Sequence, residues 1–181
     1  LHDKGHKIFI TGSNASLLSS ELGTRLTGRH ITLKIMPFSF AEFLYAQDPI
    51  IAKLNINKLD SRQLAFVKKY FHEYKKLGGF PDYLTNPQIE YLHTLYESIL
   101  YKDIIVRNKI TNQNSIKELV YYLASNNAKE FTYNSLTKLI GISNASTVAD
   151  YCNYLEDSYL CFRLNRFSYS LKKQIHYAKK I

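Results

Sequence analysis

Tryptophan is absent from the 181 residues of this sequence, and methionine occurs once, as Met36. Because that methionine is internal, we expect Leu1 to be an internal residue of a longer polypeptide. No apolar run approaches the roughly 18 residues that a membrane-spanning helix requires. The first residues also lack the basic, apolar and small-residue regions of an export signal. The sequence therefore predicts a cytoplasmic protein with no membrane partner.

Cysteine is also scarce, with Cys152 and Cys161 the two present. They lie on different predicted elements, a helix and a strand. Two isolated cysteines favour reduced thiols in a core over a disulfide, and they argue against a metal site. The six histidines are scattered, and no two share ligand spacing on one helix face. We therefore interpret the histidines as surface or capping residues and expect no bound metal.

The motifs of self-contained enzymes are missing too. The sequence contains neither G-x-x-x-x-G-K-[ST] nor G-x-G-x-x-G, so no phosphate-cradling loop lies in this chain. H-E-x-x-H, C-x-x-C and G-x-S-x-G are equally absent. The chain by itself is not expected to form a complete active site.

Acidic residues are outnumbered, with 15 Asp and Glu against 24 Lys and Arg, which gives a formal charge of +9. A basic balance favours acidic partners such as nucleic acid or nucleotide phosphates. The alternative is a basic but merely solvated surface. Lys and Arg are spread along the whole chain, which weakens the case for a single basic arm.

The N-terminal part begins with an apolar run. Residues 7–11 read as a buried strand, residues 15–22 as a helix, and the alternating "HITLKIM" of residues 30–36 as a second strand. Ser39 and Glu42 have the spacing of a capping box, which predicts a short helix through about Tyr45.

Two longer amphipathic helices are predicted next, over residues 61–77 and 88–107. The apolar face of the first contains Leu64, Val67, Phe71 and Tyr74, and Gly78-Gly79 ends it. On the second helix, Asp103 falls on the apolar stripe, where a carboxylate is costly unless it is paired. Arg107 lies one turn further on. We favour a structural ion pair or helix anchor over a catalytic carboxylate.

The polar stretch 111–115 is our preferred domain boundary. Helices are predicted over residues 115–126, 133–140 and 144–157, and a Gly-containing link at 141–143 gives helix-turn-helix spacing. "LCFRLNRF" alternates, which predicts a strand with Leu160, Phe162 and Leu164 inward and Arg163 outward. The remaining residues are predicted to turn and return as a second strand. Three helices and a two-stranded ribbon predict a winged helix, and the fold class as a whole is α+β, mostly α.

Two groups of residues are candidates for chemistry. Thr11, Ser13 and Asn14 follow the first predicted strand, and ligands of open α/β sheets bind at the carboxyl ends of strands. The alternative is a plain helix cap. Arg25 and Arg29 flank a loop, and arginine is the residue that stabilises transferring phosphate from a neighbouring subunit. The alternative is surface charge.

The order of several motifs resembles one family. These are "KIFITGSNASLLSSELGTRLTGR", "PFSFAEFL", "YKKLGGFP", "LYESILYKDIIVR", "FTYNSLTKLIGIS", "LED" and "RFS", in that order over nearly the whole chain. They resemble a family of bacterial and archaeal AAA+-type ATPases. In that family a P-loop and an acidic metal-binding strand precede this region. A domain likened to restriction-type nucleases follows the winged helix.

The resemblance implies three parts. Residues 1–45 would be the last part of the ATPase α/β core with two parallel strands, 46–110 a helical lid and connecting helix, and 111–181 a winged helix. Thr11, Ser13 and Asn14 would be a polar nucleotide sensor. Arg29, with Arg25 second, would be an arginine finger or nucleotide sensor. ATP and Mg²⁺ are implied for the full-length parent and are not expected to bind this fragment, because it lacks the P-loop.

Two functions of different classes follow, with a third open. The chain is either a sensing and docking portion of an ATPase or a DNA-binding module. The helix over 144–157 carries no Lys or Arg, so we expect at most salt-sensitive, non-specific duplex binding through the wing. The wing cations are Arg163, Arg166, Lys172, Lys173, Lys179 and Lys180. Alternatively, the winged helix docks a protein or a second copy of the chain.

Overall fold

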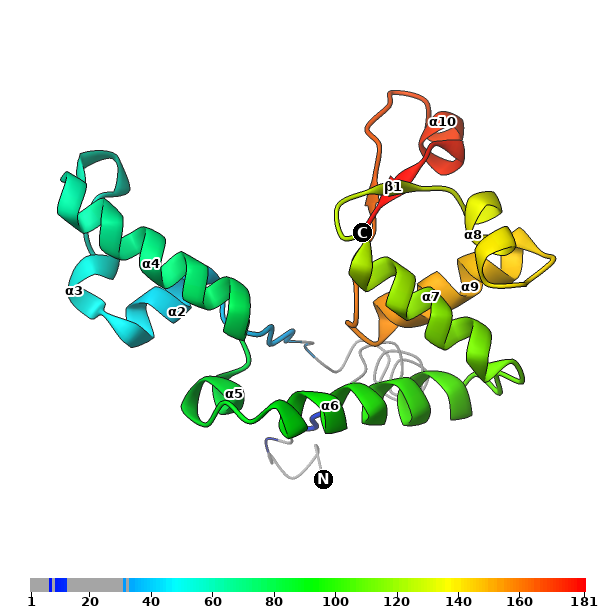
Figure 1. Cartoon of the computed structure of the whole chain (residues 1–181), viewed down its shortest axis with the longest axis horizontal. Coiled ribbons are helices and arrows are strands. Elements are labelled where there is room, and N and C mark those ends of the chain that lie inside the picture. Colours follow the sequence, from blue (N-terminus) through cyan, green and yellow to red (C-terminus); the bar gives the residue numbers. More distant parts are fainter. Residues whose placement is uncertain (1–6, 8, 13–30, 32) are drawn as a thin grey trace. The chain divides into compact units, whose positions relative to one another are not determined.

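The computed structural model describes residues 7, 9–12, 31 and 33–181 (Figure 1). These residues are mostly helical, with one small antiparallel sheet. They form two compact units, one over Ile31–Tyr96, the N-terminal unit, and one that includes Glu97–Ile181, the C-terminal unit. None of the helices described here combines the length and the hydrophobicity needed to cross a lipid bilayer.

The two parallel strands predicted over residues 7–11 and 30–36 are not formed in the residues that the structure describes. Residues 7, 9–12, 31 and 33–36 belong to no strand. Their apolar side chains face solvent, with Phe9 86% and Ile35 94% exposed. A strand needs a neighbour that pairs with its N–H and C=O groups, and no described strand pairs with either segment. The helix predicted over 15–22 lies outside the described residues.

The N-terminal unit is a set of short helices around one long one. Its elements are α2 (Phe40–Gln47), α3 (Pro49–Ala52), the 3₁₀ turn η2 (Ile56–Lys58), α4 (Ser61–Leu77), α5 (Pro81–Thr85) and the start of α6 (Ile89–Ser98). The predicted bounds of α4 are confirmed. The predicted capping box of α2 is confirmed as well. The Glu42 N–H donates to Ser39 Oγ over 3.3 Å, and the Ser39 N–H donates to Glu42 Oε2 over 2.8 Å.

Aromatic rings make most of the core of this unit. Phe43 is fully buried, and Leu44 and Tyr83 are nearly so. The ring of Phe43 lies 5.3 Å from that of Tyr74 on α4, centroid to centroid. The predicted apolar face of α4 is only partly covered, since Leu64 and Phe71 remain 41% and 44% exposed. None of the α4 side chains, all of which the structure describes, is buried.

The glycine pair after α4 holds the segment that precedes α2. Gly78 ends α4 with a positive φ of 73°, which glycine adopts without a steric cost. The Gly79 carbonyl accepts the Phe38 N–H over 2.8 Å, and the Tyr74 hydroxyl donates to the Phe38 carbonyl over 2.7 Å. A Cβ on Gly79 would lie 2.2 Å from the Phe38 carbonyl oxygen. The close approach of the two backbones therefore requires glycine at residue 79.

The helix predicted over residues 88–107 is confirmed, but its second half is wider than an α-helix. After α6 the chain continues as a π-helix, η3 (Ile99–Val106). Asp103 Oδ1 and Arg107 Nη2 are 3.6 Å apart, one turn from each other. The side chain of Asp103 is 20% exposed, so its charge has a partner where it is largely shielded from water. The predicted ion pair is confirmed.

The C-terminal unit combines helices with three two-residue strands. Its elements after η3 are α7 (Gln113–Ser125), β1 (Glu130–Phe131), α8 (Tyr133–Leu139), α9 (Ala145–Asp157), β2 (Leu164–Asn165), α10 (Leu171–His176) and β3 (Lys179–Lys180). The sheet is antiparallel with the order β1-β3-β2. The three helices predicted here are confirmed to within two residues at each end. The predicted turn before the last strand instead contains the short helix α10.

A continuous apolar core fills this unit. Its fully or nearly fully buried side chains come from η3 and from all three larger helices, among them Leu100, Ile104, Ile116, Leu119, Leu136, Val148 and Leu155. The Ser115 hydroxyl on α7 donates to the Ile140 carbonyl at the end of α8 over 2.8 Å. Gly141, at a φ of 66°, then lets the Ile142 N–H return to the Thr137 carbonyl. The link between α8 and α9 is thus the short glycine turn predicted from the sequence.

Candidate nucleic-acid interface

The stretch before β2 turns its side chains the opposite way from our prediction. Phe162 and Leu164, predicted to be inward, are 51% and 67% exposed. The side chain of Arg163, predicted to be outward, is 14% exposed. Residues 161–163 are not in a strand, so alternation does not set their direction. The position of Arg163 follows instead from its polar partners on α8 and α9.

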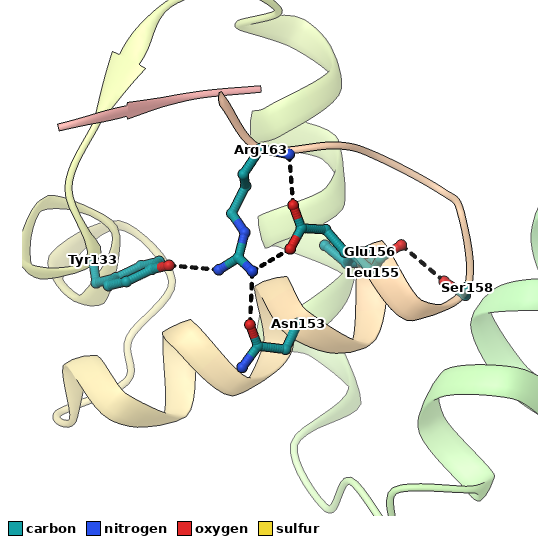
Figure 2. Close-up of polar contacts among 6 residues, drawn as sticks. All are labelled: Tyr133, Asn153, Leu155, Glu156, Ser158 and Arg163. Atoms are coloured by element: carbon teal, nitrogen blue, oxygen red, sulfur yellow. Dashed lines mark hydrogen bonds and ion pairs between the residues drawn. The ribbon is translucent and has the colours of Figure 1, made fainter. Parts of the chain in front are cut away.

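Arg163, at the start of the wing, forms hydrogen bonds with side chains of two helices, α8 and α9 (Figure 2). Its backbone N–H donates to Glu156 Oε1 on α9 over 2.6 Å, and its guanidinium forms an ion pair with Glu156 Oε2. Nη2 also donates to Asn153 Oδ1 over 2.7 Å. Nη1 donates to the Tyr133 hydroxyl of α8 over 2.5 Å. One arginine therefore connects the wing, α8 and α9.

The protonation of this cluster favours the charged pair. Burial alone would raise the pKa of Glu156, but hydrogen bonds from Arg163 more than offset it, and the pKa is lowered. Burial alone would lower the pKa of Arg163, but the hydrogen bond to Glu156 and the neighbouring charges raise it. Burial raises the pKa of the Tyr133 hydroxyl. At neutral pH the pair is charged, and most of the contacts of the Arg163 guanidinium are internal.

Lys179 of β3 is a second inward cation. Its ammonium donates to the Ile175 and Tyr177 carbonyls over 2.8 and 3.2 Å, and lies 4.9 Å from the centroid of the Tyr133 ring. Burial lowers its pKa, and the nearby Arg163 lowers it further. The cations of the wing thus divide into an inward pair, Arg163 and Lys179, and an exposed group: Arg166, Lys172, Lys173 and Lys180.

The loop between β2 and α10, residues 166–170, is called the wing loop below. It makes hydrogen bonds of its own, although it lies outside regular structure. The Gln174 side-chain amide on α10 donates to the Ser168 carbonyl over 2.5 Å, and the Ser170 N–H donates to the Ser168 hydroxyl over 3.2 Å. The guanidinium of Arg166 lies 4.9 Å from the centroid of the Tyr177 ring. These contacts give the wing loop a defined shape.

The exposed face of α9 is poorly equipped to hold DNA. Asn144, Ser146, Asp150, Asn153 and Asp157 are exposed, and the helix has no Lys or Arg. Its two candidate base-reading amides already have partners. Asn144 accepts the Ser146 N–H over 2.9 Å as the helix cap, and Asn153 accepts from Arg163. The exposed face of α9 thus presents acidic side chains and amide oxygens that already accept hydrogen bonds.

The two cysteines are free thiols, as predicted. Cys152 is buried on α9, where burial raises its pKa to about 12. Burial raises the pKa of Cys161 to about 11. Thiols with raised pKa values are poor nucleophiles at neutral pH. Among the described residues no group of three or more His, Cys, Asp or Glu could hold a metal ion, and the expectation of no metal stays a prediction.

The nucleotide-sensing residues predicted from the sequence are not brought together in the described part of the chain. Ser13, Asn14, Arg25 and Arg29 lie outside the described residues, and Thr11 is exposed outside regular secondary structure. The described residues thus include no set of groups against which ATP can be fitted. The roles of these five residues stay predictions.

One signal in the sequence escaped our reading of the charge. Lys and Arg are spread along the chain, but Asp and Glu are not: no acidic residue follows Asp157. The charged side chains from Ser158 to Ile181 are therefore all Lys or Arg, with one histidine besides. The same stretch contains Phe167 and Tyr169, which lie on the wing loop and which sequence reasoning also missed. A count of acidic residues by segment would have found this surface.

Comparison with known proteins divides the chain in two. Residues 68–181 match a family described as a domain of unknown function, DUF8612, and residues 1–44 match an AAA domain. The first match covers more than half of the chain. The chain belongs to the DUF8612 family, and its N-terminal match hints at an AAA-like ATPase.

The curated relatives are themselves uncharacterized proteins. The chain is 36% identical to the uncharacterized protein MJ1544 of Methanocaldococcus jannaschii, over 99% of this chain and 41% of that protein. It is 34% identical to an uncharacterized protein of Haemophilus influenzae, over 88% of this chain and 39% of that protein. The chain thus spans about two fifths of the length of these relatives. No solved structure matches it.

Proposed function

We propose that this chain is the sensor, lid and winged-helix portion of an AAA+-type ATPase. It contributes nucleotide sensing and DNA docking and does not hydrolyse ATP on its own. The AAA match at residues 1–44 supports the ATPase part of this proposal. The family matched over residues 68–181 is a domain of unknown function, and the docking part rests on the structure.

The observation that carries the proposal is the order of elements in the C-terminal unit. A helix, a strand, two helices joined by a tight glycine turn, and two further strands follow one another as α7, β1, α8, α9, β2 and β3. The last strand lies between the other two, pairing Phe131 with Lys179 and Leu164 with Lys180. This order supports a winged helix, in which α9 would be the second helix of the helix-turn-helix. Helix α10 is an addition within the wing.

The nucleotide side of the proposal assigns Thr11, Ser13 and Asn14 to sensing, and Arg29, with Arg25 second, to an arginine finger. ATP and Mg²⁺ would be held by a P-loop that this sequence lacks. The test is made in a full-length protein that carries this segment. Arg29→Ala should lower ATP turnover without unfolding the protein, because an arginine finger stabilises charge only in the transition state. Arg62→Ala on α4 is the matched control, and unchanged turnover in Arg29→Ala would refute the finger.

The docking side rests on the exposed cations of the wing. Arg166, Lys172, Lys173 and Lys180 face solvent on a segment without acidic residues, whereas α9 presents Asp150 and Asp157. A polyanion is therefore attracted to the wing and repelled from the exposed face of α9. Contacts of this kind reach phosphates and carry no sequence information. The docking is accordingly non-specific for sequence.

A titration of labelled duplex DNA at about 50 and 200 mM salt tests this docking. Four phosphate contacts predict a slope of log K against log salt of roughly −3 to −4. Lys172→Ala/Lys173→Ala should weaken binding and make the slope shallower by about 2. Lys68→Ala/Lys69→Ala on α4 removes the same charge from another surface, so the affinity for DNA and its salt slope should change much less. Absence of binding at low salt, or equal losses in the two variants, would contradict docking through the wing.

A further inference from the structure

The wing loop presents aromatic rings to water. Phe167 is 74% exposed and Tyr169 is 99% exposed. The two rings lie 5.3 Å apart, centroid to centroid, at an angle of 74°. Leu171 and Ile175 on the adjoining helix α10 are 75% and 68% exposed. Large apolar side chains gathered in this way mark a binding surface more often than a solvated one.

The backbone between the two rings is held by hydrogen bonds of the loop itself. Hydrogen bonds from Gln174 and Ser170 fix Ser168, the residue between Phe167 and Tyr169. Ser170 caps α10 as well, accepting the Lys173 N–H over 3.5 Å. In Figure 1 this loop, in orange, joins α10, in red, at the end of the C-terminal unit away from α7. A partner can therefore stack on the rings with little ordering of the loop itself.

Charge selects the class of partner. The segment that carries the rings has Arg166, Lys172 and Lys173 among them and no acidic residue. A partner that matches both features is a polyanion with flat apolar faces. In duplex DNA the faces of the bases are stacked on one another and hidden, so the rings could gain nothing from them. In single-stranded DNA each base offers a free face and each linkage a phosphate.

We propose that the wing loop and α10 bind single-stranded DNA, with bases stacked on Phe167 and Tyr169 and phosphates held by Arg166, Lys172 and Lys173. This inference rests on the proposed function in that it makes the wing the DNA-docking surface. It goes further in naming unpaired DNA as the preferred ligand. A wing of this kind would engage a strand that is already open.

The test compares an oligo(dT) of about 20 nucleotides with a blunt duplex of the same charge, each titrated into the full 181-residue chain. Oligo(dT) should bind more tightly than the duplex. Phe167→Ala/Tyr169→Ala should weaken the binding of oligo(dT) at least about tenfold, because the variant loses base stacking on both rings. The same variant should change the affinity for the duplex by less than about twofold. Tyr121→Ala, which removes a ring 77% exposed on α7, is the matched control and should leave both titrations unchanged.

The outcomes separate this inference from the proposed function. No binding of either DNA by the unaltered chain would overturn both. One outcome would overturn only the inference. In that outcome duplex binding depends on Lys172 and Lys173, but Phe167→Ala/Tyr169→Ala leaves the affinity for oligo(dT) unchanged. Tighter binding of oligo(rU) than of oligo(dT) would overturn it as well. So would a ring variant that abolishes self-association of the chain in sedimentation while DNA binding stays the same.

Discussion

The two units are held together in different ways. In the C-terminal unit, η3, α7, α8 and α9 all contribute buried side chains to one core. In the N-terminal unit the buried apolar side chains are Phe43, Leu44 and Tyr83 among the described residues, and the longest helix buries none. What replaces apolar burial there is a set of specific contacts: the capping box of α2, the tilted ring contact of Phe43 with Tyr74, and the backbone approach of Gly79 to Phe38.

This difference has an energetic consequence. Each fully buried aliphatic side chain contributes about 1.5–3 kcal/mol, so the C-terminal unit has many interchangeable sources of stability. The N-terminal unit has few buried apolar side chains among the described residues and depends more on specific contacts. The stability lost on mutation should therefore follow the side-chain volume removed in the C-terminal unit. In the N-terminal unit it should follow the loss of particular contact geometries.

Leu119→Ala should have the largest effect. Leu119 on α7 is fully buried, so truncation removes its burial and leaves a cavity. We expect the free energy of unfolding of the C-terminal unit to fall by about 2–5 kcal/mol. Urea unfolding gives the size of the loss, and amide hydrogen exchange gives its location. Tyr121→Ala on the same helix removes an exposed side chain and should change the free energy of unfolding by no more than about 0.5 kcal/mol. Equal loss of protection in the N-terminal unit would contradict the separation of the two units.

Glu156→Gln tests the fastening of the wing and should cost about 1–3 kcal/mol at neutral pH, the range for a hydrogen bond to a charged group. Because the folded pKa of Glu156 is lowered, its stabilising charge is fully present above the unfolded pKa of about 4.3. That contribution is lost as the pH falls through the lower, folded pKa. The variant should lack this part of the acid-side slope in urea unfolding between about pH 3 and 7. Asp157→Asn, an exposed neighbour, is the control, and a slope unchanged in Glu156→Gln would disprove the role of the pair.

Gly79→Ala should act on the N-terminal unit alone. The added Cβ cannot fit 2.2 Å from the Phe38 carbonyl oxygen, so the backbone at residue 38 must move and its hydrogen bond to residue 79 is lost. We expect a cost of about 2 kcal/mol, with faster exchange of the Phe38 amide. Gly78→Ala meets open space, but its backbone, at φ 73° and ψ −159°, lies in a region that is essentially confined to glycine, so it should cost about 1–3 kcal/mol. An unchanged exchange rate of the Phe38 amide in Gly79→Ala would show that the close approach is not required.

The parts of the fold that the sequence predicted are those with local causes. Ser39 with Glu42 starts α2, Gly78 ends α4, and the glycine turn at residue 141 joins α8 to α9, each through neighbours in the chain. The predicted strands over 7–11 and 30–36 failed among the described residues because a strand depends on a partner elsewhere in the chain or beyond it. A pattern of apolar residues cannot supply that partner.

The candidate site shows the same limit. Sequence reasoning found the cations of the wing but reversed the direction of Arg163. No neighbouring residue in the sequence indicates that Arg163 will form an ion pair with Glu156 and a hydrogen bond with Tyr133. It placed DNA contact on the wing because α9 lacks Lys and Arg, and that reasoning used composition alone. The ring pair of Phe167 and Tyr169 was missed because its exposure depends on how the wing loop folds.

The central claim is that DNA meets the wing and not α9. Amide-resolved NMR titration of the 181-residue chain with oligo(dT), and separately with duplex, tests it most directly. We predict that the largest shifts with both DNAs fall on Arg166–Lys173, with those of Phe167 and Tyr169 larger for oligo(dT), while the amides of α9 stay within the background. Shifts centred on Asn144–Asn153, or none at all with either DNA, would contradict the account.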